Sequence, residues 1–304
     1  MNIRLLAAVA LAWSVALAAA TPPTGAGAAP GYQSEIEAWR AQRLTNLTSE
    51  NGWLTLVGLY WFKPGDNTFG RAHDNALVLD NPSLAAHAGT FTLEKAAVRF
   101  SAARDAGITS NGRAVTSAEL APDTSGAPTI LSSGTLRFHV IDRVGHLGLR
   151  VRDVANPLRT HFKGLDYFPI DATWVFHAQF HAYEPAKHVQ IVNVLGMVDD
   201  MTAPGYLTFT RDGKQWRLDA LLEEPKAEDL FIMFADGTSG RETYGAGRFM
   251  YLPLPGAGEV LLDFNKAYNP PCAFNEFATC PLPPRQNRLA LRVEAGEKSY
   301  QAGH

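Results

Sequence analysis

The clearest structural pattern in the chain lies in residues 173–183, which read TWVFHAQFHAY. The even-numbered residues from Trp174 to Ala182 fall on one side of an extended backbone, and His177 and His181 fall on the other. A period of two predicts a strand with one face packed on a core.

Similar short apolar segments occupy most of the chain, at a spacing of roughly ten residues with Gly, Pro, Asn and Asp between them. They lie at residues 53–62, 68–70, 76–79, 89–93, 97–100, 129–131, 136–141, 147–152, 189–195, 205–210, 215–222, 229–235, 248–254, 259–264 and 288–293. We therefore predict an all-β fold of antiparallel sandwich or barrel units, with a short N-terminal helix.

The helix is expected over residues 31–47. Ser34 is a candidate N-cap, and Glu37 follows it at capping-box spacing. Arg40 and Arg43 lie on a mixed face of this helix. We expect that face to be solvated, with contacts to acids elsewhere in the chain as the alternative.

The composition limits the class of protein. The chain has 304 residues, of which 46% are hydrophobic, so it can bury the core of one or two domains. The formal net charge is -3 and no basic run is present, which argues against a nucleic-acid partner.

The N-terminus has the features of a secretory signal peptide. Arg4 precedes the apolar run Leu5–Leu17, and Ala18-Ala19-Ala20 fits a cleavage site. The run is short for a membrane span, so we expect cleavage, a periplasmic or secreted protein and no stable span afterwards. An uncleaved anchor is the alternative.

These patterns divide the chain into five parts. They are a signal peptide at 1–20, a linker at 21–30, the helix region at 31–50, a β-sandwich at 51–153 and a C-terminal β domain with a polar loop site at 154–304.

The first β unit resembles forkhead-associated domains. Arg71, Ser83, His87 and Asn111 follow one another at about the intervals of that family, although the interval from Ser83 to His87 is one residue longer. The resemblance implies a similar sandwich, with Arg71, Ser83 and Asn111 in loops. Because an exported protein meets little phosphothreonine, we do not expect phosphopeptide binding.

Polar groups concentrate in the loop at residues 236–248, which reads DGTSGRETYGAGR. Its glycines allow a tight backbone with inward N–H groups, and Arg241 and Arg248 add donors for carboxylate or phosphate. Tyr244 adds a hydroxyl. A structural hairpin in which Arg248 pairs with Asp263 is the alternative.

Asp263 and Asn265 share one face of the strand at residues 260–265. A carboxylate between bulky apolar neighbours requires a partner when it is buried. Asp263 is therefore either half of a structural ion pair, or a ligand-contacting group or general base.

The two cysteines, Cys272 and Cys280, are an even pair in a chain expected to be exported. Their spacing differs from the C-x-x-C pattern of oxidoreductases. We expect a structural disulfide, with free thiols or a redox pair as alternatives.

No metal and no cofactor are expected. His177 and His181 would lie roughly 13 Å apart on a regular strand, too far to bind one metal ion. Flavin, haem-attachment and nicotinamide signatures are absent from the sequence. Ser239 lacks the G-x-S-x-G context of a nucleophile.

The chain resembles a bacterial family known as domain of unknown function 1684. The similarity lies in residues 53–60, 65–70, 162–171, 236–248, 263–274 and 280–298, and so covers nearly all of the chain after the linker. The family supplies no reaction, so the resemblance implies no mechanism.

The favoured hypothesis is an exported module with a cleft formed by Arg241, Tyr244, Arg248, Asp263 and Asn265. Arginines and loop amides favour a small polar or anionic ligand. The first alternative is a hydrolase or transferase that uses Asp263 as general base and Arg248 as electrostatic stabiliser. The second is a structural envelope protein without a small ligand.

Overall fold

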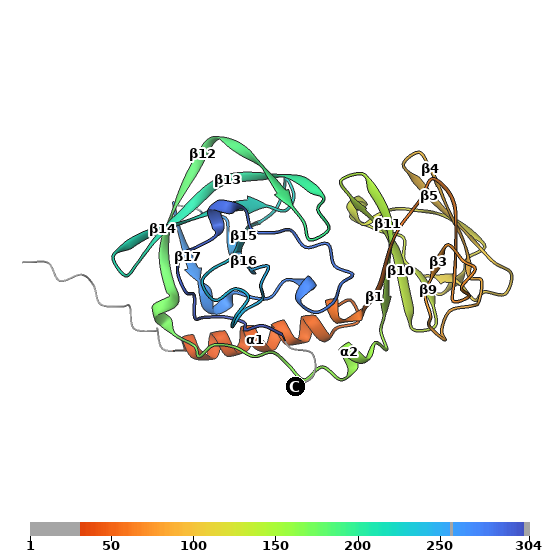
Figure 1. The fold of residues 1–304 in the computed structure, drawn as a ribbon, viewed down its shortest axis with the longest axis horizontal. Helices are drawn as coiled ribbons and strands as arrows, with labels where there is room; N and C mark the ends of the chain where they lie inside the picture. Colours follow the sequence, from red (N-terminus) through yellow and green to blue (C-terminus); the bar gives the residue numbers. More distant parts are fainter. Residues whose placement is uncertain (1–30, 256–257, 301–304) are drawn as a thin grey trace, which may run out of the picture.

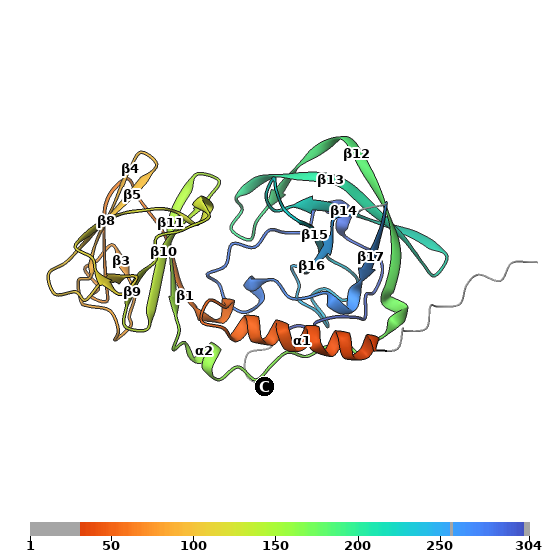
Figure 2. The ribbon, with the colours of Figure 1, turned by 180° about the vertical axis from the view of Figure 1, so that it is seen from behind.

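The computed structural model describes residues 31–255 and 258–300. The expected signal peptide and linker lie outside the described residues. The described residues form two β units joined along one side by a helix (Figures 1 and 2), which confirms the predicted all-β class.

The first unit is a sandwich of two sheets. One sheet has the order β1 (Leu56–Trp61), β11 (His146–Asp153), β10 (Leu136–Arg143), β9 (Leu131–Ser133), β6 (Thr109–Ser110) and β7 (Arg113–Ala114). The other has the order β3 (Leu77–Val78), β2 (Gly65–Gly70), β4 (Gly89–Glu94), β5 (Ala97–Ala102) and β8 (Ser117–Leu120). All neighbours are antiparallel except β2 and β3, which are parallel.

Phenylalanines from both sheets fill the sandwich core. Phe69, Phe91 and Phe100 come from β2, β4 and β5, and Phe138 comes from β10. The ring centroids of Phe91 and Phe138 lie 6.4 Å apart and the rings meet edge to face. These contacts hold the two sheets together, and each sheet turns its other face outward.

The second unit is a single, strongly curved sheet that nearly closes into a barrel (Figure 1). Its order is β16 (Arg248–Pro253), β15 (Asp229–Phe234), β14 (Lys214–Leu222), β13 (Val198–Arg211), β12 (Val175–Val192) and β17 (Glu259–Asp263).

The alternation predicted for residues 173–183 is confirmed over most of that segment. Trp174 and Ala178 are buried and Phe176 packs on the barrel core, while His177 and His181 are exposed. Ala182 departs from the pattern because β12 loses regular pairing with β13 between Ala182 and Lys187.

The chain after β17 covers the remaining gap of the barrel without forming a long strand. Tyr268 and Phe249 exchange two backbone hydrogen bonds, of 3.0 and 2.9 Å, so the segment after β17 pairs briefly with the edge strand β16. Residues 264–298 then run as 3₁₀ turns and irregular backbone.

Helix α1 (Tyr32–Thr48) spans the barrel and reaches the sandwich (Figure 2). The expected helix is present, but Gly31 is the N-cap and no side chain caps this end, so Ser34 does not have the expected role. The short helix α2 (Pro157–Thr160) lies in the connection between the two units.

The expectation of a solvated arginine face on α1 is wrong. Arg43 Nε donates to Glu297 Oε1 at 2.8 Å, and Arg43 Nη2 donates to the carbonyl oxygen of Asn269 at 2.9 Å. Arg40 lies over the Tyr167 ring at 4.1 Å. Glu297 and Asn269 belong to the irregular C-terminal chain and Tyr167 to the connection after α2, and helical periodicity gives no information about them.

Arg43→Met should destabilise the protein by about 3 kcal/mol or more in urea unfolding, because it leaves the Glu297 carboxylate buried without its cation. Glu35→Ala is the control. It removes the exposed 2.6 Å pair with Lys266 and should cost less than about 1 kcal/mol. Equal losses of unfolding free energy in the two variants would mean that the Arg43–Glu297 pair stabilises the fold no more than an exposed pair.

Candidate functional site

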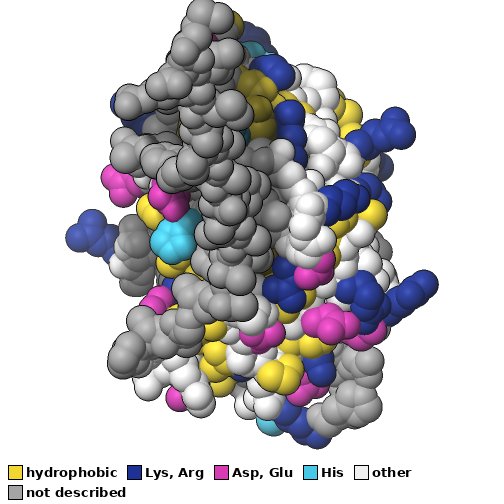
Figure 3. All heavy atoms as spheres, turned by 90° about the vertical axis from the view of Figure 1, so that its left-hand side faces the viewer, with side chains coloured by type: hydrophobic (Ala, Val, Ile, Leu, Met, Phe, Trp, Pro, Cys, Tyr) yellow, Lys and Arg dark blue, Asp and Glu magenta, His cyan; other side chains and the backbone are white. Residues whose placement is uncertain are grey.

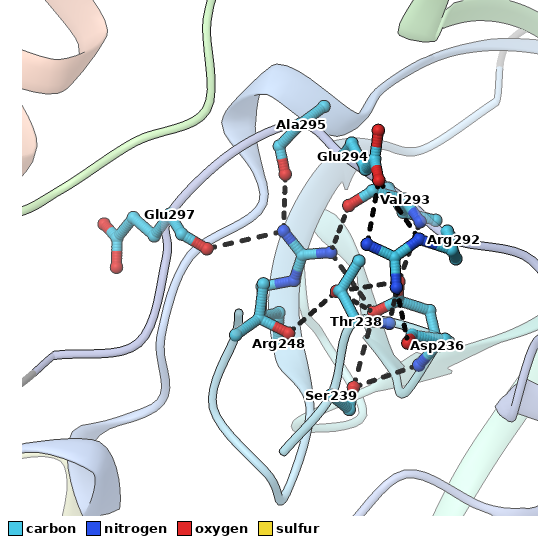
Figure 4. A network of polar contacts seen from close by, with 11 residues as sticks. Asp236, Thr238, Ser239, Arg248, Arg292, Val293, Glu294, Ala295 and Glu297 are labelled. Atoms are coloured by element: carbon cyan, nitrogen blue, oxygen red, sulfur yellow. Dashed lines mark hydrogen bonds and ion pairs between the residues drawn. The ribbon is translucent and has the colours of Figure 1, made fainter. Parts of the chain in front are cut away.

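The loop at residues 236–248 is organised around a buried ion pair (Figure 4). The side chains of Arg248 and Asp236 are completely inaccessible, with Arg248 Nη2 3.2 Å from Asp236 Oδ1. Arg248 also donates to the carbonyl oxygens of Val293, at 2.9 Å, and Ala295. Burial lowers the pKa of Arg248, and the charge of Asp236 opposes this shift.

Asp236 uses its remaining acceptor capacity within the same network. Its Oδ2 accepts from the backbone N–H of Val293 at 2.8 Å and of Thr238 at 3.1 Å. Ser239 Oγ accepts from the Asp236 N–H at 3.0 Å and donates to its carboxylate at 3.3 Å. These contacts tie the loop to the C-terminal chain and direct its polar groups inward.

Asp263 belongs to a different network. It lies at the end of β17, where Oδ1 accepts from the Asn265 N–H at 2.9 Å and caps the turn that follows. The Tyr32 hydroxyl of α1 donates to the carboxylate at 2.9 and 3.0 Å. Asn265 Nδ2 lies 3.0 Å from Oδ1 and 2.9 Å from the Tyr32 hydroxyl.

The alternative in which Arg248 pairs with Asp263 is therefore wrong. The backbone turn after Asp263 and the helix α1 satisfy the carboxylate, while Asp236 is the partner of Arg248. Asp263 is only 4% exposed.

The two other residues of the expected cleft also lie elsewhere. The Tyr244 hydroxyl donates to the carbonyl oxygen of Cys272 at 3.1 Å, and Arg241 is exposed. None of the five expected residues lines either of the two cavities described below, within the ranges that the structure covers. The structure does not bring them together as one cleft.

The expected disulfide is not formed, and Cys272 and Cys280 are both free. The Cys272 N–H donates to Cys280 Sγ at 3.1 Å. The contact with the Cys280 thiol lowers the pKa of Cys272, and the same contact together with burial raises that of Cys280.

The larger cavity has a volume of about 940 Å³ and lies where α1, the β10–β11 hairpin and the barrel meet. Its lining includes the aromatic residues Trp39, Trp53, Phe249, Tyr251 and Tyr268. Its polar lining includes Gln42, Arg43, Asn46, Asp142, Arg143, Asn193, Asp199, Glu223 and Thr279. A concave surface of aromatic rings with a few polar groups is typical of small-molecule sites.

One wall of this cavity carries a connected row of polar and aromatic groups. Glu223 follows β14, and its Oε2 accepts from the Tyr251 hydroxyl at 2.5 Å. The rings of Tyr251 and Tyr268 stack with centroids 6.3 Å apart, and the Arg43 guanidinium lies 4.6 Å from the Tyr268 ring centroid.

Glu223 and Tyr251 are exposed at the edge of this wall, and neighbouring groups change their pKa values. Loss of hydration raises the pKa of Glu223, the nearby Glu224 raises it further, and the hydrogen bond from Tyr251 lowers it. Burial also raises the pKa values of Tyr251 and Tyr268. A carboxyl group with a raised pKa in a cavity is a candidate for proton transfer.

Little in the sequence indicates this wall. Glu223 stands in an ordinary polar turn, Glu223-Glu224-Pro225, and Tyr251 lies on a strand that reads as apolar. The only available signal is the density of aromatic residues in the C-terminal half, and that density does not say which rings border a cavity.

Two findings on the described part of the chain concern metal-ligand clusters and long apolar helices. No group of three or more His, Cys, Asp or Glu side chains there could hold a metal ion. Residues 31–255 and 258–300 also contain no helix with the length and apolarity needed to cross a bilayer.

The residues behind the forkhead-associated resemblance do not share a cavity. Arg71 is exposed, Ser83 Oγ lies 3.2 Å from Thr135 Oγ1, and Asn111 lines the smaller cavity of the sandwich.

The fold defines a two-part all-β protein with a cavity where the two units meet. Over residues 160–298 the chain matches the family described as "Protein of unknown function (DUF1684)", and it belongs to that family. The matched range excludes residues 53–60 and 65–70, so the family similarity covers the C-terminal unit rather than nearly the whole chain.

Two solved structures are similar to parts of the chain. One is the solution NMR structure of an uncharacterized protein of Haloarcula marismortui. The two sequences are 33% identical, the match covers 46% of this chain and 78% of that chain, and the TM-score is 0.40. The other carries the description "Structural and functional analysis of phosphothreonine-dependent FHA domain interactions". Its sequence is 18% identical, and the match covers 32% of this chain and 96% of that chain. Its TM-score of 0.22 is no support for a shared fold. No curated protein matches the chain.

Arg248→Met should lower the free energy of unfolding by about 3–5 kcal/mol, because the Asp236 carboxylate would stay buried without its cation. Arg241→Met, on the exposed part of the same loop, should change it by less than about 0.5 kcal/mol. Urea unfolding of both variants provides the measurement. Wild-type stability in Arg248→Met would contradict the structural role of the pair.

Tyr251→Phe should raise the pKa of Glu223 further, because it removes a hydrogen bond that stabilises the ionised carboxylate. The measurement is the carboxyl ¹³C chemical shift of Glu223 as a function of pH. Tyr244→Phe serves as the control, since that hydroxyl donates to a backbone carbonyl outside the cavity. An unchanged or lowered pKa in Tyr251→Phe would contradict the prediction.

Proposed function

We propose that this protein is an exported binding module that holds a small polar molecule in the inter-unit cavity. The single observation behind this proposal is the cavity of about 940 Å³, which has both aromatic and hydrogen-bonding walls. Small-molecule sites generally combine a concave, largely apolar lining with a few oriented polar groups.

The walls favour a ligand with one flat apolar face and several polar groups. The Trp39, Trp53 and Tyr251 rings offer broad apolar surfaces. Around them, the Asn193 amide can both donate and accept, and the Glu223 and Asp199 carboxylates accept hydrogen bonds from hydroxyl or amino groups. The proposed ligand class is therefore polar, while the place of binding differs from the 236–248 loop.

Arg43 and Arg143 add cationic groups, but each already has a carboxylate partner. Arg43 pairs with Glu297, and Arg143 Nη2 lies 2.7 Å from Asp123 Oδ2. Their charges are thus largely compensated, which favours a polar ligand over a strongly anionic one.

The exported location is part of the proposal and rests on the sequence of residues 1–20, with Arg4 before the apolar run Leu5–Leu17. A binding module outside the cytoplasm would meet its ligand directly from the medium.

A catalytic role is the second candidate, because one observation favours it. Glu223 combines a 2.5 Å hydrogen bond from Tyr251 with a raised pKa at the cavity wall, as a general acid or base requires. We do not propose Asp263 and Arg248 for this role, because both side chains already form hydrogen bonds or an ion pair with other groups of the protein.

The binding proposal is tested by thermal shift and tryptophan fluorescence with a panel of monosaccharides, amino acids, nucleosides and carboxylic acids. Two of the six tryptophans line the cavity, so a bound molecule should change the emission. Tyr251→Ala should weaken binding of any active compound by about tenfold, which corresponds to about 1.4 kcal/mol.

Tyr206→Ala is the matched control, because Tyr206 packs on Arg217 outside the cavity and should leave the affinity unchanged. If no compound of the panel changes the melting temperature or the tryptophan emission, the cavity is not the binding site. The same holds if Tyr251→Ala and Tyr206→Ala lose equal affinity. For the catalytic alternative, Glu223→Gln should retain binding of the active compound but abolish its conversion, followed by NMR of the incubated mixture.

A further inference from the structure

A second cavity, of about 690 Å³, lies on the sandwich and is separate from the site proposed above. It lies against the outer side of the sheet that contains β9, β10 and β11. Arg137, His139 and Arg152 line it, together with the hydroxyl residues Thr109 and Ser132.

Strand register places basic residues together on this side of the sheet. Arg137 pairs with Arg152, His139 with Arg150 and Arg143 with His146 across β10 and β11. The alternate positions of the same strands, such as Phe138 and Val151, are in the sandwich core. Six basic residues therefore share the outer face of two neighbouring strands.

Most of this positive charge has no carboxylate partner among the described residues. Arg137 Nη1 donates to the carbonyl oxygens of Gly134, at 2.9 Å, and Leu136, at 2.8 Å. Arg152 Nη1 donates to the carbonyl oxygen of Gly52 at 2.8 Å and to Thr55 Oγ1 at 3.1 Å. These neutral partners orient the guanidiniums without neutralising them.

Arg150, the cross-strand neighbour of His139, adds a third charge on the same face of the sheet. It is 3% exposed, its Nε has no hydrogen-bond partner in the described structure, and its Nη2 is 3.4 Å from Thr279 Oγ1. The Trp53 ring lies 5.5 Å from the Arg150 guanidinium and 5.4 Å from that of Arg152, so an aromatic surface holds both in place. Arg143 alone in this group forms an ion pair, with Asp123.

The pKa of His139 reflects the positive charge around this cavity. It is 9% exposed and lies opposite Arg150 across β10 and β11. Burial lowers its pKa to about 4, and the neighbouring cations Arg150 and Arg152 contribute to the shift. The imidazole is thus neutral at pH 7 in the free protein, although an anion beside it would favour its protonated form.

We propose that this cavity binds an oxyanion, the carboxylate or phosphate group of a small molecule, through Arg137 and Arg152. Their guanidinium forks suit planar or tetrahedral oxyanions, and His139 becomes a further donor by taking up a proton when the anion binds. Thr109 and Ser132 supply hydroxyl donors. Glu50 is the single acid of the lining, and its charge opposes the binding of an anion.

The first test is isothermal titration calorimetry of the full-length protein with sodium sulfate, sodium phosphate and sodium citrate at low ionic strength. Arg137→Gln should weaken sulfate binding by about tenfold, because it removes an oriented cation. Arg99→Gln makes the same charge change on the exposed side of the other sheet and should have little effect. Equal losses in the two variants, or no sulfate binding by the wild type, would overturn the proposal.

The second test uses pH, with sulfate because its charge is constant over the range. The charged groups around His139 are Arg150 and Arg152 on β11, Arg143 on β10 and Asp123, together with Arg137 and Glu50 of the cavity lining. The titration covers the range from about pH 7 to pH 5, where histidine ordinarily takes up its proton. Affinity should rise as the pH falls through this range, with proton uptake seen as a buffer-dependent heat.

His139→Gln should still bind sulfate but lose both the pH dependence and the proton uptake. A wild-type affinity that is independent of pH would exclude the role of His139. Phosphate binding tighter than citrate binding would identify a phosphate-type ligand, and the reverse order a carboxylate. Tyr251→Ala should leave sulfate binding unchanged, so failure of the inter-unit cavity as a site would not affect this result.

Discussion

The structure depends on how the irregular chain at residues 264–298 satisfies its backbone polar groups inside a nearly closed barrel. A sheet supplies hydrogen-bond partners by repetition, whereas an irregular buried segment needs a side chain at each point. Arg248 binds two of its carbonyl oxygens, and the wholly buried Asn287 donates to the carbonyl oxygens of Asp219 and Met233 at 2.9 and 2.8 Å. The polar residues that distinguish the C-terminal sequence thus serve mainly to hold the segment in place.

The same segment determines where the larger cavity forms. Glu297 accepts from the Asn269 N–H at 2.7 Å and from Arg43 of α1, so it joins the irregular chain to the helix. Arg43 in turn lies over Tyr268, whose ring stacks on Tyr251 at the cavity wall. The buried Glu297 and the cavity wall are therefore linked by one series of contacts. The reason is that helix α1, which packs on the barrel, also forms one side of the cavity.

Charge is arranged differently in different parts of the molecule. On the barrel side shown in Figure 3, Lys and Arg side chains are interspersed with Asp and Glu, and the visible described surface carries no patch of one sign. The barrel interior pairs its buried arginine with a buried carboxylate. The outer face of β10 and β11 instead gathers basic groups with only Asp123 as an ion-pair partner, and carbonyl and hydroxyl groups orient them. This contrast makes the sandwich face unusual within the protein.

The sequence alone determined the all-β class, the N-terminal helix and the inward face of residues 173–183, because these follow from side-chain periodicity over short distances. It also identified the C-terminal stretches that carry the family resemblance. It could not decide whether Arg248 and Asp263 face a ligand or the protein, since a buried ion pair and a binding group use the same residue types. Only the tertiary structure decided that Asp236 and Tyr32 are their partners, and that Glu223, Tyr251 and Arg43 meet at a cavity. These residues are distant in sequence, so their contacts depend on how the helix, the barrel and the irregular C-terminal chain pack together.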